Sequence, residues 1–181
     1  MADKDWIAGA RRVLSPNRDS RPPGTDITLA VLHSISLPRG RYRKDAGGDA
    51  IELLFTNRLD ASAHASFADL AGLRVSSHFL IYRGGELVQF VPLESRAWHA
   101  GASRWRGRER CNDFSVGIEL EGVDDGAFEA AQYVRLQRLL RELQRRLPLR
   151  DLAAHSDVAP GRKSDPGTGF DWPRLLAALG R

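Results

Sequence analysis

Two of the five histidines in the sequence stand where a catalytic metal site can be built. His33 and His155 each close a short apolar run rich in residues that favour β-strands. Strand ends are rigid and open onto loops, where functional sites are commonly assembled. Asp165 follows His155 in a loop held by prolines and glycines. Two neutral imidazoles and one carboxylate form a known zinc shell with a fourth position for water, so these three residues are candidate ligands.

The spacing of these residues does not prove a metal site. A histidine taken alone is more often a hydrogen-bonded polar residue than a ligand. Lys163 lies two residues before Asp165, and its ammonium group would suit an oxyanion formed when water attacks an amide. A solvated loop lysine is the alternative interpretation for Lys163.

Two carboxylates are candidates for a general base beside such a metal. In the segment SVGIELEG, Glu119 and Glu121 alternate with apolar residues, so both lie on one face of a predicted strand over 115–122. A zinc-bound water has a lowered pKa, and a nearby carboxylate can take its proton. Periodicity does not choose between the two glutamates, and both would face solvent if the strand lay at a sheet edge.

A basic segment, SRWRGRER, surrounds Trp105 with Arg104, Arg106, Arg108 and Arg110. Three interpretations fit it. Arginines can bind phosphates while a tryptophan stacks on bases. They can grip carboxylates at a pocket edge in bidentate fashion. They can also lie on a solvated strand or loop, which the sequence alone favours. The formal net charge of +4 fits either an arginine-rich surface or an acidic partner.

The elements that must position these residues follow from apolar patterning. The run from Ile27 to Leu32 predicts a strand buried on both faces. A short helix is expected over 50–55, and Gly84-Gly85 between two β-prone runs predicts a two-residue hairpin. An apolar stripe predicts an amphipathic helix over 125–146, ended by Pro148. Its members are Phe128, Ala131, Leu136, Leu139, Leu140 and Leu143.

The remaining segments complete a mixed architecture. A short strand leads to His155, and Asp171 is expected to cap a last helix that ends before Gly180. Residues 38–50, 56–75 and 94–114 are expected to be loops. The element order predicts an α/β (α+β) fold with one domain over 1–181, in which helices flank a mixed central β-sheet.

The length and the cysteine content narrow the class of protein. A chain of 181 residues suits one well-buried core. The single cysteine, Cys111, cannot form an internal disulfide. The N-terminal residues mix charges into their first turns, unlike a signal peptide, and we see no apolar run of membrane-spanning length. We therefore expect a cytoplasmic protein, although a phage protein released by lysis would look the same.

Several motifs together resemble one enzyme family. They are VLHSISLP, RAWHAG, GRERCNDFSVGIELEG and HSDVAPGRKSDPG. The chain resembles AmpD-type 1,6-anhydro-N-acetylmuramoyl-L-alanine amidases, within the zinc amidases that include peptidoglycan-recognition proteins and some phage lysozymes. The resemblance runs from about residue 6 to residue 173. It implies a peptidoglycan-recognition/amidase-type fold.

The resemblance also implies roles for individual residues. The metal ligands would be His33, His155 and Asp165, with Zn²⁺ as the cofactor. The catalytic residues would be Glu119, the first glutamate of IELEG, and Lys163. The substrate-binding residues would be Arg110, for a stem-peptide carboxylate, Trp98, in the sugar pocket, and Ser34, where close relatives often have asparagine. Motif positions without an implied role are Arg74, His78 and His99.

The expected function is that of a zinc-dependent hydrolase. It would cleave the amide bond between (1,6-anhydro-)N-acetylmuramic acid and L-alanine of muropeptides during cytoplasmic peptidoglycan recycling. The expected partner is a small anionic muropeptide, with no nucleic acid and no membrane, and the expected state is a monomer. The alternatives are a peptidoglycan-binding module without catalysis and a phage or secreted lysin that attacks intact cell wall.

Overall fold

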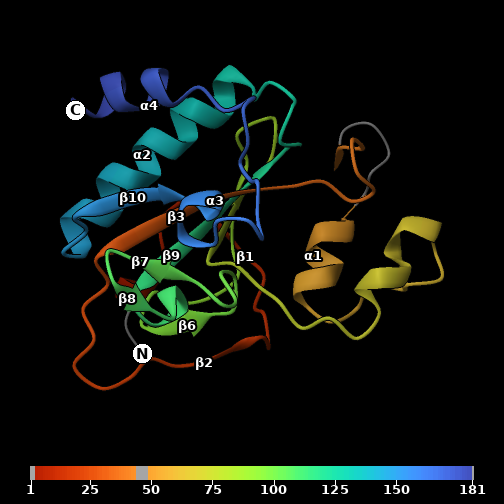
Figure 1. Cartoon of the computed structure of the whole chain (residues 1–181), viewed down its shortest axis with the longest axis horizontal. Helices are drawn as coiled ribbons and strands as arrows, with labels where there is room; N and C mark the ends of the chain where they lie inside the picture. The colour runs from red at the N-terminus through yellow and green to blue at the C-terminus, as the bar shows by residue number, and fades with distance from the viewer. Residues whose placement is uncertain (1–2, 44–48, 181) are drawn as a thin grey trace.

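The computed structural model describes residues 3–43 and 49–180 (Figure 1). Its centre is a six-stranded sheet in the order β1-β5-β4-β9-β3-β10. The bounds of these strands are Arg11–Arg12, Leu87–Gln89, Phe79–Ile81, Ser115–Glu121, Leu29–Ile35 and Asp151–Ala154, in the same order. Neighbouring strands are parallel except β4 and β5, which form an antiparallel hairpin. The sheet is therefore mixed, as predicted.

The two long strands at the centre, β3 and β9, pair in parallel along their whole length. In this register His33 lies beside Glu119 and Ile35 beside Glu121. Paired residues of neighbouring strands point to the same face of a sheet. The apolar run suggested that His33 lies at the end of its strand. The strand continues to Ile35, so His33 lies within it.

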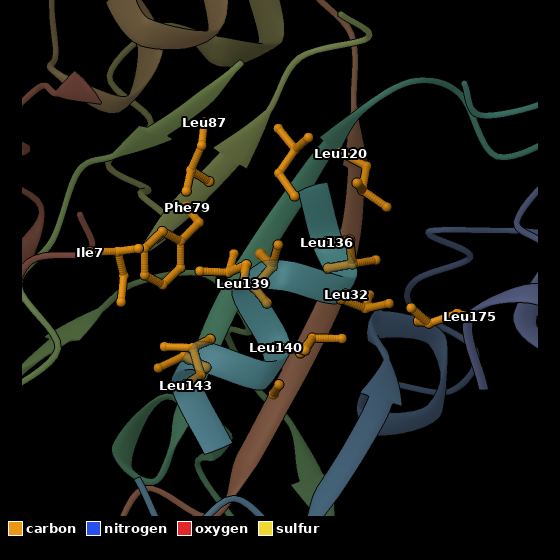
Figure 2. Close-up of a cluster of buried hydrophobic side chains, with 14 of the residues drawn as sticks. Ile7, Leu32, Phe79, Leu87, Leu120, Leu136, Leu139, Leu140, Leu143 and Leu175 are labelled. Atoms are coloured by element: carbon orange, nitrogen blue, oxygen red, sulfur yellow. The ribbon is translucent and has the colours of Figure 1, made fainter. Parts of the chain in front are cut away.

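One face of the sheet, which we call the helix-covered face, packs against α2 (Ala130–Arg146) and α4 (Trp172–Leu179). Figure 2 shows side chains of α2 and Leu175 of α4 meeting side chains of the strands. The buried strand residues on this face are Ala30, Leu32, Phe79, Ile81, Leu87, Val116, Ile118 and Leu120. This is the largest apolar cluster among the described residues, and it provides a rigid support for the opposite face.

The long helix α2 begins at Ala130, five residues later than the apolar stripe predicted. Glu129 and Gln132 form a capping box at its start, and the buried Gln132 amide also donates to the backbone oxygens of Ile81 and Glu121. Such a box fixes a helix start because it satisfies backbone N–H groups that lack partners within the helix. Ala131, expected in the buried stripe, is exposed.

The last helix follows its predicted signals. The side chain of Asp171 accepts a hydrogen bond from the backbone N–H of Arg174, and Pro173 lies in the first turn. Gly180 ends the helix with a left-handed φ of 73°. Glycine takes this conformation without the steric cost that other residues have.

The other face, which we call the site face, is covered by α1 (Ala50–Phe55) and by loops. Figure 1 shows α1 on the side of the molecule away from α2 and α4. Glu52 of α1 receives hydrogen bonds from the guanidinium of Arg11 and from the hydroxyl of Tyr82. Residues 65–70 form a 3₁₀ helix, η3 (Ala65–Leu70), and residues 44–48 of the predicted loop 38–50 lie outside the described part of the chain.

Two predictions need correction, the length of one hairpin loop and the absence of regular structure in the segment 94–114. The β4–β5 hairpin has a three-residue loop, because Tyr82 and Glu86 still pair through their backbones; Gly85 has a φ of 84°. Three-residue hairpin loops need one left-handed residue, which glycine supplies. The segment 94–114 contains β6 (Ser95–Ala97), the hairpin of β7 (Arg104–Trp105) and β8 (Arg108–Glu109), and the 3₁₀ helix η4 (Cys111–Asp113). Strand β6 pairs with β2 (Arg18–Ser20).

The first described residues form a short 3₁₀ helix, η1 (Asp3–Asp5), and the histidine after β10 opens a single helical turn, α3 (His155–Val158). Among the described residues, no helix has both the length and the apolar character needed to cross a bilayer.

Candidate active site

Three side chains converge on the site face. The Nδ1 atoms of His33 and His155 lie 2.9 Å apart. One carboxylate oxygen of Asp165 lies 3.0 Å from Nδ1 of His155 and 3.3 Å from Nδ1 of His33. These residues form a group whose ligand atoms all lie within 4.8 Å of one another. The structure therefore brings together the three residues that the sequence predicted as metal ligands.

Sheet topology places the two histidines side by side. Strand β10 pairs in parallel with β3, and Ala154 lies beside Leu32. His155 follows Ala154 directly and opens α3, so its ring reaches the ring of His33. Asp165 comes from the loop after α3. Its backbone oxygen accepts a hydrogen bond of 3.0 Å from the N–H of Ser156, which fixes the loop beside α3.

Hydrogen bonds on the outer side of the two rings point their lone pairs inward. Nε2 of His155 faces the carbonyl oxygen of Ala100 at 3.4 Å, a contact that is satisfied when the ring carries its proton on Nε2. Nε2 of His33 lies 3.0 Å from Nδ1 of His99, whose Nε2 lies 3.1 Å from the hydroxyl of Ser115. A run of donors from His33 to His99 to Ser115 satisfies each of these contacts.

With both Nε2 atoms protonated, the two Nδ1 atoms and the Asp165 oxygen are all electron-pair donors without a proton between them. Three acceptors at about 3 Å repel one another unless a cation lies among them. Two imidazole nitrogens and one carboxylate suit zinc, and outward N–H groups bonded to a second layer of residues are typical of metal-bound histidines. The donor set therefore fits a divalent cation.

Electrostatics at the cluster agree with this arrangement. Burial lowers the pKa of His33 to about 4, which keeps its ring neutral near pH 7. Burial alone would raise the pKa of Asp165, but its close contacts with His155 and His33 outweigh it, and the pKa of this carboxyl falls below its usual range. A neutral ring and an ionised carboxylate are the forms that bind metal.

Glu119 lies next to the cluster and has an unusual environment. Its Oε1 is 4.0 Å from Nδ1 of His33, and the side chain is 10% exposed. Its Oε2 is buried and has no hydrogen-bond partner among the described residues. Burial raises the pKa of Glu119 well above its usual value, and the charge of Asp165 acts in the same direction. A carboxylate held in this way is suited to proton transfer.

Glu121 lies on the same face, but both of its oxygens have partners. It accepts hydrogen bonds from the backbone N–H groups of Arg43, at 2.6 Å, and Arg83, at 3.0 Å. It therefore ties a loop and a hairpin to the sheet. Because β9 is a central strand, neither glutamate faces solvent, and Glu119 is the one that faces the cluster.

Lys163 is exposed in the loop before Asp165. Its positive charge acts on both His33 and Glu119 and lowers the pKa of each. Lys163 lies two residues before Asp165, so it belongs to the same loop as the third candidate ligand.

The three predicted substrate-binding residues lie at different places around the cluster. The hydroxyl of Ser34 donates to Oδ1 of Asp124 at 2.9 Å. Trp98 is half-buried, and its backbone N–H donates to the hydroxyl of Ser76 at 3.1 Å. Arg110 is exposed, and its Nε lies 3.3 Å from Oδ2 of Asp113. Their predicted contacts with a substrate stay predictions.

An open groove of about 560 Å³ runs beside α3. Its walls include Arg104, Arg110 and Arg162, with Glu109 as the acidic residue of the group. Val158 and Ala159 line the same groove, so it lies next to the segment that carries His155. The groove is therefore basic and borders α3, and its lining residues do not include the three candidate ligands.

The arginines of the β7–β8 hairpin have partners within the chain. Arg104 pairs with Glu109 at 3.7 Å and Arg106 with Asp151 at 3.0 Å. The guanidinium of Arg108 lies 4.0 Å from the ring centre of Phe114. The solvated strand that the sequence favoured for this segment is what the structure shows.

The motif positions without a predicted role differ in their surroundings. His99 bridges His33 and Ser115, as described above. His78 is buried, accepts a hydrogen bond from the N–H of Gly117 and lies 3.1 Å from the carbonyl oxygen of Ser95. Arg74 is exposed at a separate hollow of about 160 Å³ near α1. The structure thus brings His99 to the cluster and leaves Arg74 away from it.

Two residues near the cluster were not among the predicted site residues. Gly117 faces the ring of His99, and a Cβ atom there would lie 2.5 Å from that ring. Asp124 bonds the residues beside two of the predicted ligands. A glycine within a strand can indicate a close approach of another group, which is the one signal that would have pointed to Gly117.

Comparison with known proteins gives consistent matches. The family model described as N-acetylmuramoyl-L-alanine amidase matches residues 23–168. The chain is 51% identical over 183 residues to 1,6-anhydro-N-acetylmuramyl-L-alanine amidase AmpD of Escherichia coli K12, covering 100% of this chain and 98% of that protein.

Solved structures of amidases and of a peptidoglycan recognition protein are similar to this chain. A crystal structure of a selenomethionine derivative of AmpD is 50% identical, covers 99% of both chains and has a TM-score of 0.93. The E. coli amidase AmiD, in complex with its substrate anhydro-N-acetylmuramic acid-L-Ala-D-gamma-Glu-L-Lys, is 29% identical with a TM-score of 0.61, over 87% of this chain and 60% of that one. Peptidoglycan recognition protein-LE is 12% identical with a TM-score of 0.63 over 94% of each chain, which shows that the fold is shared.

Proposed function

Because the chain belongs to the N-acetylmuramoyl-L-alanine amidase family, we propose that it is a zinc-dependent enzyme acting on anhydromuropeptides. Amidase activity follows from the family; the zinc ion and the 1,6-anhydro sugar are the proposed parts. The bond cleaved joins the lactyl carbonyl of 1,6-anhydro-N-acetylmuramic acid to the amine of L-alanine. The observation that carries the proposal is the convergence of His33, His155 and Asp165 beside an oxygen of Glu119 that has no hydrogen-bond partner among the described residues.

His33, His155 and Asp165 would hold the metal through the atoms that converge. When bound, zinc supplies a Lewis acid that lowers the pKa of water and polarises a carbonyl. The protein supplies the rest of the site. The sheet fixes both imidazoles, and the hydrogen bonds to Ala100 and His99 hold the rings in the tautomer that a metal needs.

Glu119 is the proposed proton carrier. Its carboxylate takes the proton of the attacking water, the water oxygen bonds to the lactyl carbonyl carbon, and the carbonyl oxygen becomes negative. Collapse of this intermediate breaks the carbon–nitrogen bond, and Glu119 returns the proton to the departing amine of L-alanine. The buried Oε2 of Glu119 has no partner in the described chain, so it is available for this transfer.

Lys163 and the basic groove have supporting roles in this proposal. The ammonium group of Lys163 stabilises the negative oxygen, because its charge already acts on Glu119 and His33. The arginines of the groove attract the carboxylates of the stem peptide. AmiD, whose structure was solved with an anhydro-N-acetylmuramic acid peptide, supports this class of substrate.

Mass spectrometry of a purified anhydromuropeptide tests the proposal. Zinc-loaded wild-type protein is expected to release the free peptide and the anhydro sugar. Metal-stripped protein and zinc-loaded Glu119→Gln are expected to release neither within the same time. Bound zinc without peptide release from the wild type would instead support a peptidoglycan-binding module.

Glu121→Gln is the matched control for the proton carrier. It changes a second buried carboxylate on the same strand, which contacts backbone N–H groups and not the cluster. We expect it to keep activity at temperatures where it is folded. A loss equal to that of Glu119→Gln, with the fold intact, would contradict the assignment of Glu119.

The cellular role is a further part of the proposal. We propose that the enzyme acts in peptidoglycan recycling in the cytoplasm, as a monomer. A comparison of soluble anhydromuropeptide with insoluble sacculi separates this role from that of a lysin, because a recycling enzyme is expected to prefer the soluble substrate. Cell fractionation and sedimentation test the location and the monomeric state.

A further inference from the structure

The three predicted ligands come from segments of unequal rigidity. His33 lies in the central strand β3, and His155 follows β10 directly. Asp165 lies between α3 and α4, in a segment without helix or strand. A metal site needs its ligands held to within about 0.5 Å, so something must fix this loop against the sheet.

Asp124 contacts the segments of two ligands at once. Its Oδ1 accepts a hydrogen bond of 2.9 Å from the hydroxyl of Ser34, the residue after His33. Its Oδ2 accepts a hydrogen bond from the hydroxyl of Ser164, the residue before Asp165. One carboxylate therefore joins the strand of the first ligand to the loop of the third.

Backbone packing reinforces the same junction. The N–H of Gly169 donates to the backbone oxygen of Asp124 at 2.9 Å. A Cβ atom at Gly167 would lie 2.2 Å from that oxygen, and a Cβ atom at Gly169 would lie 2.1 Å from the backbone oxygen of Gly126. The loop approaches the Asp124 turn so closely that only glycine fits at these two places.

The beginning of the loop is held separately. The guanidinium of Arg162 donates to the backbone oxygens of Ala100, at 2.6 Å, and Ala102, at 2.7 Å. Asp165 thus lies between one anchor at Arg162 and a second anchor at Asp124. The second anchor is the one that reaches β3, so it sets the separation between Asp165 and His33.

We propose that Asp124 is a positioning residue that sets the geometry of the metal site by accepting hydrogen bonds from both Ser34 and Ser164. This inference rests on the proposed metal site. It also gives Ser34 a different role from the one that the resemblance implied, because its hydroxyl is directed to Asp124. Asp124 needs no contact with the substrate to affect activity.

Zinc affinity provides a test that does not depend on catalysis. In a competition assay with a chromophoric chelator, Asp124→Ala is expected to bind zinc about 10-fold to 100-fold more weakly than the wild type, the range seen when residues that support metal ligands are removed. Excess zinc is expected to restore much of the kcat of Asp124→Ala. Asp124→Asn is expected to retain most of the affinity, because its amide can accept from one serine and donate to the other.

Asp125→Ala is the matched control. It removes the same charge from the neighbouring position, where the side chain is 80% exposed and pairs with Arg39 at 3.3 Å. Its zinc affinity is expected to equal that of the wild type. The double variant Ser34→Ala/Ser164→Ala is expected to reproduce the loss seen in Asp124→Ala, and it replaces that variant if Asp124→Ala does not fold.

The outcomes separate the two proposals. If the wild type binds no zinc, the metal site itself is wrong. If the wild type binds zinc and both Asp124→Ala and the double serine variant bind it equally well, Asp124 does not position the ligands. Absorption spectra of the cobalt-substituted proteins give a second readout: the positioning role requires a change in coordination for Asp124→Ala and none for Asp125→Ala.

Discussion

Strand β9 separates two buried regions with opposite chemistry. Val116, Ile118 and Leu120 point to the helix-covered face and pack against hydrocarbon, whereas Glu119 and Gly117 point to the site face. All of the strand is buried. On the helix-covered face contacts are non-directional, so residues of similar volume can replace one another at small cost. On the site face each polar group needs a particular partner, so its identity matters more than its size.

The largest effect that separates the faces is expected from Glu119→Gln. It removes the proton carrier and is expected to lower kcat/KM about 10²-fold to 10⁴-fold. Because burial raises the pKa of Glu119 well above its usual value, an uncharged amide is not expected to destabilise the fold. Peptide release and thermal unfolding, measured on the same preparation, check both halves. If Glu119→Gln kept its activity, Glu119 would not be the proton carrier on the site face.

Leu136→Ala is the reverse experiment. This side chain of α2 is fully buried against the strands (Figure 2). Its truncation is expected to lower the free energy of unfolding by about 2–5 kcal/mol. Zinc affinity is expected to stay unchanged at temperatures where the protein is folded, because Leu136 touches only the opposite face. Urea unfolding and zinc titration measure the two quantities, and a large fall in zinc affinity would show that the faces are coupled.

Gly117→Ala tests how tightly the site face is packed. The new Cβ atom would lie 2.5 Å from the His99 ring, which supports His33. Overpacking of this kind costs about 1–3 kcal/mol of stability. The displaced ring is expected to weaken zinc binding as well, which separates this change from Leu136→Ala. Calorimetry and zinc titration check it, and an unchanged affinity would show that His99 does not support the ligand.

The smallest effect concerns the ion pair that fastens α1 on the site face. Burial raises the pKa of Glu52, but hydrogen bonds from Arg11 and Tyr82 outweigh it, so the pKa lies below its usual 4.5. The stability from this carboxylate is present above pH 4.5 and is lost as pH falls through the folded-state value. Glu52→Gln is expected to reduce that acid-dependent loss, by less than about 1 kcal/mol since Arg11 is partly exposed. Urea unfolding midpoints of the wild type and of Glu52→Gln, measured across this pH range, check the prediction. An identical dependence of the midpoint on pH in the two proteins would contradict it.

The sequence predicted those parts of the molecule that depend on local pattern. Alternation in SVGIELEG placed Glu119 and Glu121 on one face, and the α2 stripe identified most of its buried leucines. Alternation alone could not choose between the glutamates, because Arg43, a backbone partner that distinguishes Glu121, lies 78 residues away along the chain. The early start predicted for α2 failed because Glu129 and Gln132 fix the cap there.

The candidate site shows the same division. The residue types of His33, His155 and Asp165, and their places next to apolar runs and in a constrained loop, indicated a metal site, and the motifs then implied the same three ligands. The support around them had no local signal. Asp124 acts through two serines that lie 90 and 40 residues from it in sequence, so only the folded chain shows their junction.

Cys111, the single thiol of the chain, is fully buried between Ala100 and Val158, beside the segment that carries His155. Burial also raises its pKa, so its sulfur is a poor nucleophile in the closed protein. An alkylating dye can therefore react only when this part of the interior transiently opens. The labelling rate of this thiol would therefore report how often the packing around Cys111, next to the segment that carries His155, opens locally. A comparison with and without a bound metal ion would show how far the ion slows this opening.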